Sequence, residues 1–244
     1  MKVLGVIPAR YASSRFPGKP LIDLNGKTMI RRVYEGAGRS GMINELVVAT
    51  DDQRIFDEVK SFGGKVRMTG EHHPSGTDRC AEVLTDYPDV DVVINIQGDE
   101  PLVDHRQIDQ LLEAFRDPSV KIATLGIRDV HPDDLTNVNR IKIVVGHDHS
   151  ALYFSRSCIP NHAHTKTDDP LRVYPYLRHI GLYAYRAEVL RELTKLEPTH
   201  LERTESLEQL RWLYYGYPIK VVETTIETPN IDVPTDVEKV LQFL

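Results

Sequence analysis

The alternation of strand-like and helix-like segments up to Gly126 constrains the fold more than any other feature of this chain. Short apolar runs rich in Val and Ile alternate with segments whose apolar residues recur at helical spacing, as Ile55, Val59 and Phe62 do. The connections are short, which is typical of βαβ units in an α/β protein with a mostly parallel central sheet flanked by helices. The clearest strand, 90–96, is almost continuously apolar, as expected of a strand buried on both faces.

After Gly126 the rhythm changes, and the segment at about 127–180 is expected to be an insertion in a single domain spanning 1–244. This insertion would complete a pocket or form an oligomer contact. The expected strands cover 2–7, 46–50, 65–68, 90–96, 121–126, 141–145, 151–154, 180–185 and 218–223. The expected helices cover 27–39, 52–62, 77–85, 105–116, 187–195, 203–215 and a last one opened by Pro234-Thr235-Asp236.

Composition excludes several classes of protein. The 244 residues are 41% hydrophobic and 27% charged, as in an ordinary soluble globular chain. A net charge of −6 argues against a nucleic-acid-binding protein that relies on a basic face. Two cysteines, Cys80 and Cys158, are too few for a disulfide framework. Met1 leads directly into the first strand and no 18-residue apolar run occurs, so we expect a cytoplasmic protein without a membrane partner.

A cationic loop follows the first strand. The strand is expected to end at Pro8, since proline cannot continue the ladder, and the loop beyond it carries Arg10, Arg15 and Lys19. Ligands of open α/β sheets bind beyond the carboxyl ends of the strands. Guanidinium groups and an ammonium at that place suit a polyphosphate. The alternative is a solvated basic loop that joins a strand to a helix.

Two acidic turns could hold a metal ion. The buried strand 90–96 leads into Gln97-Gly98-Asp99-Glu100-Pro101, where Asp99 follows a glycine that permits a sharp turn. A carboxylate at a strand's carboxyl end can bind Mg²⁺, which prefers oxygen ligands and substrate phosphates. Asp232, just before the last helix, offers a second carboxylate. For both residues the alternative is an ordinary cap of the helix that follows.

Polar side chains near other expected elements could contact a ligand. The loop 73–79 could form a wall against a nucleobase, because its small residues allow close approach of backbone amides. It could equally be a capped turn with Thr77 as the N-cap. Arg156 and His179 stand beside expected strands, where ordinary packing is the competing interpretation.

The expected helix 203–215 carries a further polar pair. Leu207, Leu210 and Tyr214 are expected to form its core stripe. Glu208 and Gln209 then lie off that stripe, where they could bind a polyhydroxylated ligand or remain ordinary surface residues.

Several familiar motifs are excluded. The segment 36–41 matches G-x-G-x-x-G but follows a helix and precedes a strand, the reverse of a dinucleotide fingerprint. No Walker A sequence and no G-x-S-x-G elbow occur. The histidine pairs at 147/149 and 162/164 lack companion cysteines, so a zinc site is not expected.

Taken together, the ordered motifs resemble the sugar-acid cytidylyltransferases, and most closely the members that activate 3-deoxy-manno-octulosonate (Kdo) for lipopolysaccharide synthesis. The resemblance runs through nearly the whole chain. The blocks that carry it are the cationic loop, Gln-Gly-Asp-Glu-Pro (97–101), Ser-Gly-Thr-Asp-Arg (75–79), Ala-Leu-Tyr-Phe-Ser-Arg (151–156), Arg-His-Ile-Gly-Leu-Tyr (178–183), Glu-Ser-Leu-Glu-Gln-Leu-Arg (205–211) and the acidic turn at 230–234. It implies a Rossmann-like nucleotide-diphospho-sugar transferase fold and a homodimer formed through the insertion.

The resemblance also implies an in-line attack of the sugar 2-hydroxyl on the α-phosphate of CTP, with CTP as co-substrate and Mg²⁺ as cofactor. Alternatives are a related sugar acid, such as 8-amino-Kdo or sialic acid, and a nucleotide-binding module without catalysis. The implied catalytic residues are Arg10, Lys19, Asp99 and Asp232, of which Asp99 and Asp232 bind the metal. The implied CTP contacts are Ala9, Arg10, Arg15, Lys19, Ser75, Gly76, Arg79 and Gln97. The implied Kdo contacts are Gln97, Arg156, His179, Tyr183, Glu208 and Gln209.

Overall fold

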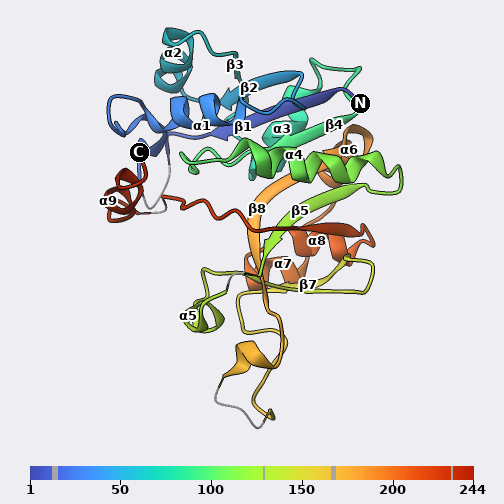
Figure 1. The fold of residues 1–244 in the computed structure, drawn as a ribbon. Coiled ribbons are helices and arrows are strands. Elements are labelled where there is room, and N and C mark those ends of the chain that lie inside the picture. Colours follow the sequence, from blue (N-terminus) through green and yellow to red (C-terminus); the bar gives the residue numbers. More distant parts are fainter. Residues whose placement is uncertain (13–15, 129, 166–168, 232) are drawn as a thin grey trace.

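The computed structural model describes residues 1–12, 16–128, 130–165, 169–231 and 233–244. In this part of the chain nine strands form one sheet with the order β3-β2-β1-β4-β8-β5-β9, extended by β6 beside β8 and by β7 beside β6 (Figure 1). The strands are β1 (Val3–Ala9), β2 (Glu45–Thr50), β3 (Val66–Met68), β4 (Val92–Asn95), β5 (Ile122–Ile127), β6 (Lys142–Val145), β7 (Ala151–Ser155), β8 (Leu177–Arg186) and β9 (Ile219–Thr224).

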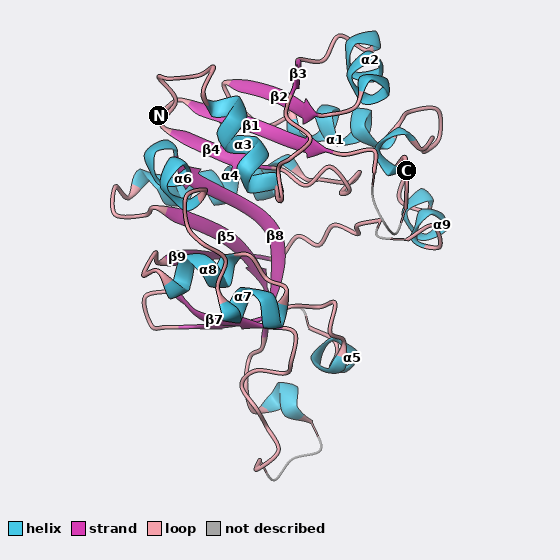
Figure 2. Ribbon diagram, turned by 180° about the vertical axis from the view of Figure 1, so that it is seen from behind, coloured by secondary structure: helices cyan, strands magenta, loops and turns pink. Residues whose placement is uncertain are grey.

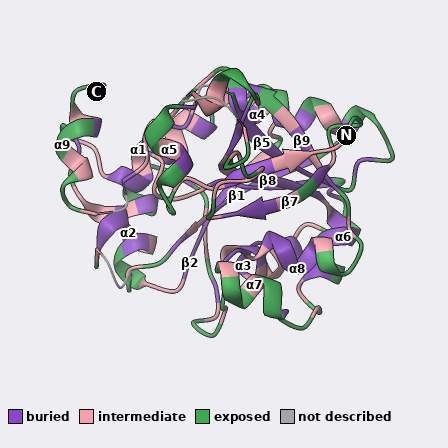
Figure 3. Cartoon of the chain, turned by 90° about the horizontal axis from the view of Figure 1, so that it is seen from below, coloured by how far each residue is buried: buried purple, intermediate pink, exposed green. Residues whose placement is uncertain are grey.

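Helices cover both faces of the sheet (Figure 2). They are α1 (Met29–Ala37), α2 (Gln53–Ser61), α3 (Gly76–Leu84), α4 (His105–Glu113), α5 (Pro132–Thr136), α6 (Ala187–Leu193), α7 (His200–Glu205), α8 (Gln209–Tyr214) and α9 (Asp236–Leu241). Apolar residues of α1, α2, α4 and α9 belong to one core cluster, and those of α3, α6 and α8 belong to the other. The strands β1, β2, β4 and β5 between these two layers are accordingly almost wholly buried (Figure 3), and the layered arrangement confirms the expected α/β architecture.

The order of the strands creates a crevice beside β1. The chain first moves outward from β1 through α1 to β2 and then to β3, and α3 returns it to β4 on the other side of β1. These four strands are parallel, so their carboxyl ends share one edge of the sheet. A reversal of strand order of this kind opens a binding crevice beyond the carboxyl ends. The loops after β1 and β4 therefore meet where a ligand is expected.

Beyond β4 the sheet is mixed. Strand β8 is antiparallel to both β4 and β5, whereas β5 and β9 are parallel. Strand β8 is long and continues past the end of β4 into the lower part of the molecule in Figure 1. It thus joins the parallel part of the sheet, β3-β2-β1-β4, to the part built from β6 and β7.

Pro8 does not end the first strand as expected, because β1 continues to Ala9 in register with β2. The Val6 carbonyl accepts from Ile96 N at 2.9 Å, which shows that Val6 faces β4. Pro8, two residues on, faces the same side, where β4 has already ended at Asn95. Its missing N–H therefore breaks no bond of the sheet.

The expected helix 203–215 is also wrong in one respect, because it is two helices. Ser206 adopts a left-handed conformation with φ 52°, which ends α7 and starts a new helix at Gln209. The interruption changes the phase of the apolar face. Trp212 is buried instead of Tyr214, whose exposed fraction is 64%.

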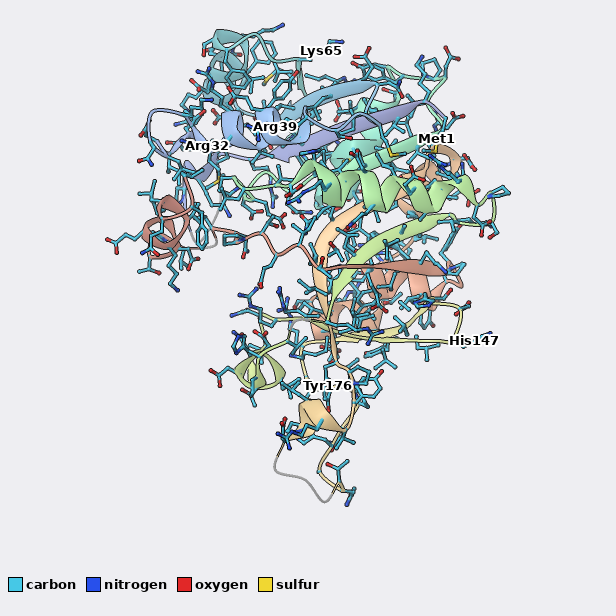
Figure 4. The ribbon with its side chains drawn as sticks, viewed as in Figure 1. Met1, Arg32, Arg39, Lys65, His147 and Tyr176 are labelled. Carbon is cyan, nitrogen blue, oxygen red and sulfur yellow. The ribbon has the colours of Figure 1, made fainter. Side chains whose placement is uncertain are left out.

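The segment 127–180 adds α5, β6, β7 and a protruding loop near 157–176 to the body of the domain. Figures 1 and 2 both show this loop extending away from the helices, and Tyr176 lies at its base (Figure 4). A small apolar cluster of Val130, Leu135 and Tyr176 holds the base together. No helix in the described ranges has both the length and the apolar content needed to cross a membrane.

Candidate active site

Lys19 connects the three segments that meet at the crevice. Its Nζ donates to Asp99 Oδ2 at 2.8 Å and to the Ile231 carbonyl at 2.8 Å. Ile231 N in turn donates to the Asp99 carbonyl at 3.1 Å. The cationic loop, the turn after β4 and the approach to the last helix are therefore held together by one buried ammonium and one backbone bond.

Local backbone chemistry aims Lys19 inward. Gly18 has a left-handed φ of 73°, and its N–H donates to the Tyr11 carbonyl at 2.9 Å, which closes the loop after β1. A short 3-10 helix at Lys19–Leu21 follows. The turn after β4 depends on a glycine too, because a Cβ at Gly98 would lie 2.7 Å from the Pro8 carbonyl oxygen.

Asp99 does not cap the next helix, so that alternative is wrong. Asp104 is the N-cap of α4 and accepts from Arg106 N at 2.8 Å. Asp99 instead pairs with Lys19 and lines an adjoining cavity. Of the other predicted residues at this edge, Ala9 is buried and Arg10 is exposed. Arg15 and Asp232 lie outside the described residues.

The start of α3 closes another side of the crevice. Ser75, rather than Thr77, is the N-cap, and its Oγ accepts from Asp78 N at 3.2 Å. Gly76 packs against the ends of β1 and β4, because a Cβ there would lie 3.4 Å from Pro8 Cγ and from Asn95 Nδ2. The capped turn is thus confirmed, and it lies beside the strand ends that carry the predicted phosphate loop.

The Arg79 side chain is engaged by partners within the protein. It is only 1% exposed, its Nη2 donates to Asp51 Oδ2 at 2.6 Å, and its Nη1 donates to the Thr69 hydroxyl. Asp51 and Thr69 follow β2 and β3, so the guanidinium ties the ends of these strands to α3. The contact of Arg79 with CTP stays a prediction.

A cavity of about 400 Å³ adjoins Asp99 and is lined by four of the six predicted sugar contacts, Gln97, Arg156, His179 and Tyr183. This volume is in the usual range for small-molecule sites. Gln97 is fixed there because its Nε2 donates to the Gly181 carbonyl at 3.0 Å. The turn that carries Asp99 is thereby bound to β8.

An irregularity in β8 shapes this cavity. Tyr183 pairs with Thr124 of β5, but the next residue of β5 pairs with Ile180, so Gly181 and Leu182 have no partner there. Thr124 Oγ1 compensates, since it lies 2.9 Å from the Leu182 carbonyl and 3.2 Å from the Ile180 carbonyl. Bulges of this kind often lie beside active sites, where they redirect side chains.

The same threonine fixes the protonation of His179. Because the Thr124 proton goes to a carbonyl, the hydroxyl oxygen accepts from His179 Nε2 at 3.1 Å. Burial, reinforced by the neighbouring Arg178 charge, lowers the pKa of His179 to about 3. The neutral ring then carries its proton on Nε2 and leaves Nδ1 as an acceptor.

Arg156 is held rigidly by backbone carbonyls. Its Nε donates to Glu205 O at 2.6 Å, its Nη1 to Val138 O at 2.9 Å and its Nη2 to Ser206 O at 3.2 Å. The buried Lys142 donates to the Arg156 carbonyl at 2.6 Å. The guanidinium therefore joins the cavity to the turn between α7 and α8.

Glu208 and Gln209 do not line this cavity, and Glu208 instead contacts the start of α3. Glu208 Oε2 accepts from Thr77 at 2.8 Å, and its Oε1 lies 2.9 Å from the Ser75 hydroxyl. Burial raises the pKa of Glu208, although both hydrogen bonds oppose the shift. A predicted sugar contact thus meets the predicted nucleotide loop.

Several buried polar atoms in this region have no partner among the described residues. They include the Tyr183 hydroxyl and Gln209 Nε2, both predicted sugar contacts. The others are Asn95 Oδ1, Arg178 Nε, the Tyr185 hydroxyl and Trp212 Nε1. Buried polar groups are normally hydrogen-bonded, so such atoms beside a cavity point to a ligand or water.

The sequence analysis missed six polar residues that line the cavity: Glu100, Asn139, Arg140, Arg178, Thr228 and Asn230. Glu100 stands directly after Asp99 in the acidic turn that was already singled out. Arg178 stands directly before His179 in a block that was already singled out. The others lie in stretches without a regular period, and only the folding of the chain brings them to β8.

Comparison with known proteins agrees with this geometry. The family described as cytidylyltransferase matches residues 4–226. A 3-deoxy-manno-octulosonate cytidylyltransferase of Phocaeicola vulgatus is 53% identical, with 100% of this chain and 98% of the relative covered. One of Bacteroides thetaiotaomicron is 51% identical with the same coverage.

Among solved structures, a CMP:2-keto-3-deoxy-manno-octonic acid synthetase complexed with CTP superposes with a TM-score of 0.92. It is 42% identical, and the match covers 100% of this chain and 98% of the other. With the matching residues spread over the whole length, this chain belongs to the cytidylyltransferase family, among the 3-deoxy-manno-octulosonate cytidylyltransferases.

Proposed function

We propose that this chain transfers the cytidylyl group of CTP to Kdo, forming CMP-Kdo and pyrophosphate. The observation that carries the proposal is the junction of Lys19 and Asp99 at the crevice, with a sugar-sized cavity beginning at Asp99. Lys19 can bind phosphates and lies beside Asp99, and Asp99 borders the polar cavity for the sugar. The phosphate-binding group and the sugar cavity are therefore adjacent, as a transfer between the two substrates requires.

The 2-hydroxyl of Kdo attacks the α-phosphorus of CTP in line, the new P–O bond forms, and the bond to pyrophosphate breaks. Positioning and charge stabilisation dominate such a reaction, and no covalent enzyme intermediate is required. Lys19, Arg10 and Arg15 neutralise the charge that grows on the α-phosphate and the leaving pyrophosphate. Ser75, Gly76 and the backbone at the start of α3 hold the base.

The residues around the cavity orient the sugar. Gln97 is fixed beside Asp99 by its bond to Gly181, and His179 Nδ1 accepts a hydrogen bond from a sugar hydroxyl. Arg156 supplies positive charge, while the unpartnered Tyr183 hydroxyl supplies a further polar contact. Glu208 supports both substrates, because it bonds the loop at the start of α3 from the sugar side.

The donor set at Asp99 fits Mg²⁺. Its carboxylate is partly exposed at 31% and borders the cavity, and Mg²⁺ needs only one or two protein carboxylates beside water and phosphate oxygens. Asp99 and Asp232 would hold the ion, which supplies positive charge beside the α-phosphate and lowers the pKa of the attacking hydroxyl.

Release of pyrophosphate tests the proposal. The purified chain, supplied with CTP, Mg²⁺ and Kdo, should release one pyrophosphate for each CMP-Kdo formed. A panel of sugar acids with each of four nucleoside triphosphates defines the pair of substrates. Binding of CTP without release with any sugar acid would refute catalysis, and release only with another sugar acid would reassign the substrate.

We also propose that two copies of the chain associate through the segment 127–180. This segment exposes apolar side chains, with exposed fractions of 62% for Leu152, 57% for Val138 and 51% for Val173. Light scattering should give twice the chain mass, and Leu152→Glu should shift the equilibrium toward the single chain. A monomeric mass at micromolar concentration would contradict this.

A further inference from the structure

Arg178 is a buried cation whose hydrogen-bonding capacity is only partly used. Its side chain is 7% exposed, and its Nη2 donates to Glu227 Oε1 at 2.5 Å. Its Nε has no hydrogen-bond partner among the described residues, and Asp134 Oδ2 lies 4.0 Å away, beyond hydrogen-bonding distance. A buried charged donor left unpaired costs considerable free energy unless a ligand or water accepts from it.

Arg178 lines the same cavity as His179 but at a different depth. Gln97, in the turn that carries Asp99, donates to the Gly181 carbonyl, so this turn meets β8 at Gly181. Three residues along β8 span about 10 Å, so the Arg178 backbone lies that far from the Gly181 level. Residue 178 is also beyond the end of β4, in register with Ile127 of β5 and Lys142 of β6. Arg178 therefore belongs to the end of the cavity remote from Asp99.

The groups that face this remote end are donors. Arg140 and Arg178 line the cavity, whereas the carboxylates that pair with them, Glu227 and Asp134, are not among its lining residues. Glu227 accepts from Arg178, and Asp134 Oδ1 lies 3.5 Å from Arg140 Nε. A guanidinium N–H bonds an oxygen acceptor but repels an ammonium group.

We infer that Arg178 recognises the hydroxyl at the end of the exocyclic side chain of the sugar acid and rejects a sugar that carries an amine there. The inference rests on the proposed function, since it places the reacting 2-hydroxyl beside Asp99 and the side chain at the remote end. It adds the residue that chooses between the hydroxyl sugar and its amino analogue.

The first test uses the unaltered protein. Pyrophosphate release at pH 7 should show a kcat/KM for Kdo at least about tenfold higher than for 8-amino-Kdo, since the amine is protonated and cannot accept from Nε. Equal kcat/KM values for the two sugars would overturn the inference. No release with either sugar acid would instead refute the proposed function, so the two failures are distinguishable.

The second test uses Arg178→Lys, which keeps the positive charge beside Glu227 but removes the Nε donor. The kcat/KM for Kdo should fall about 10- to 100-fold, and the preference over the amino analogue should shrink to a few-fold. Arg39→Lys, at an exposed arginine just after α1 that is labelled in Figure 4, is the matched control and should keep both values. An equal loss for both sugars, with the preference unchanged, would mean that Arg178 only supports the fold.

Discussion

The half-buried histidine of β8, which lines the cavity, should make the stability of the protein depend on pH. His179 has a folded-state pKa of about 3, against about 6.5 in an unfolded chain. Between these values the unfolded state binds one more proton, so stability is fully present above pH 6.5 and is lost as the pH falls toward 3. From pH 7 to pH 5 this single group should remove about 2 kcal/mol from the free energy of unfolding.

His179→Gln isolates that contribution, because glutamine can still donate to Thr124 but does not titrate. Urea unfolding at pH 7 and pH 5 should show a decline about 2 kcal/mol smaller in the variant than in the unaltered chain. His147→Gln is the control, since His147 is exposed (Figure 4) and its removal should leave the decline unchanged. The same decline in the His179 variant and the unaltered chain would refute the argument that burial keeps this ring neutral.

Three other perturbations test the site and its support. Lys19→Met should lower pyrophosphate release by about 10²–10³ while the circular dichroism spectrum stays native, because one stabilising charge at the phosphates is removed; near-normal turnover would exclude this role. Arg79→Met should lower the free energy of unfolding by about 3–5 kcal/mol, since it breaks a largely buried ion pair in which the Asp51 side chain is only 15% exposed; a loss below about 1 kcal/mol would contradict the pair's importance. A thiol reagent should modify Cys158 in the folded protein and Cys80 only after denaturation. The reason is that burial raises the pKa of Cys80 and excludes the reagent. Rapid reaction of both thiols in the folded protein would show that the core around α3 opens readily.

Local pattern predicted the elements of this fold well, because most of them are regular and strongly apolar on one side. The strand 90–96 and the helix beginning at about 77 needed no information beyond their own residues. The errors lie where distant contacts decide. Pro8 continues its strand only because β4 has ended beside it, and the helix 203–215 breaks at Ser206 without a glycine or proline.

The candidate site divides in the same way. Lys19 and Asp99 were expected to meet because both follow parallel strands of one sheet, and their pairing at 2.8 Å confirms it. The ion pair of Arg79 with Asp51 was not expected, because Asp51 follows a separate strand and no local pattern predicts such a pair. Arg178 was missed as a cavity residue because only the bulge and the extension of β8 show which cavity it lines.

The bulge of β8 limits how this protein can change its choice of sugar. Removing a single residue between Ile180 and Tyr183 would shift the pairing of β8 by one residue beyond that point, so that its side chains would exchange faces. Aliphatic side chains would then enter the polar cavity, and polar side chains would enter the hydrophobic core. New preferences should therefore arise by replacing side chains in place.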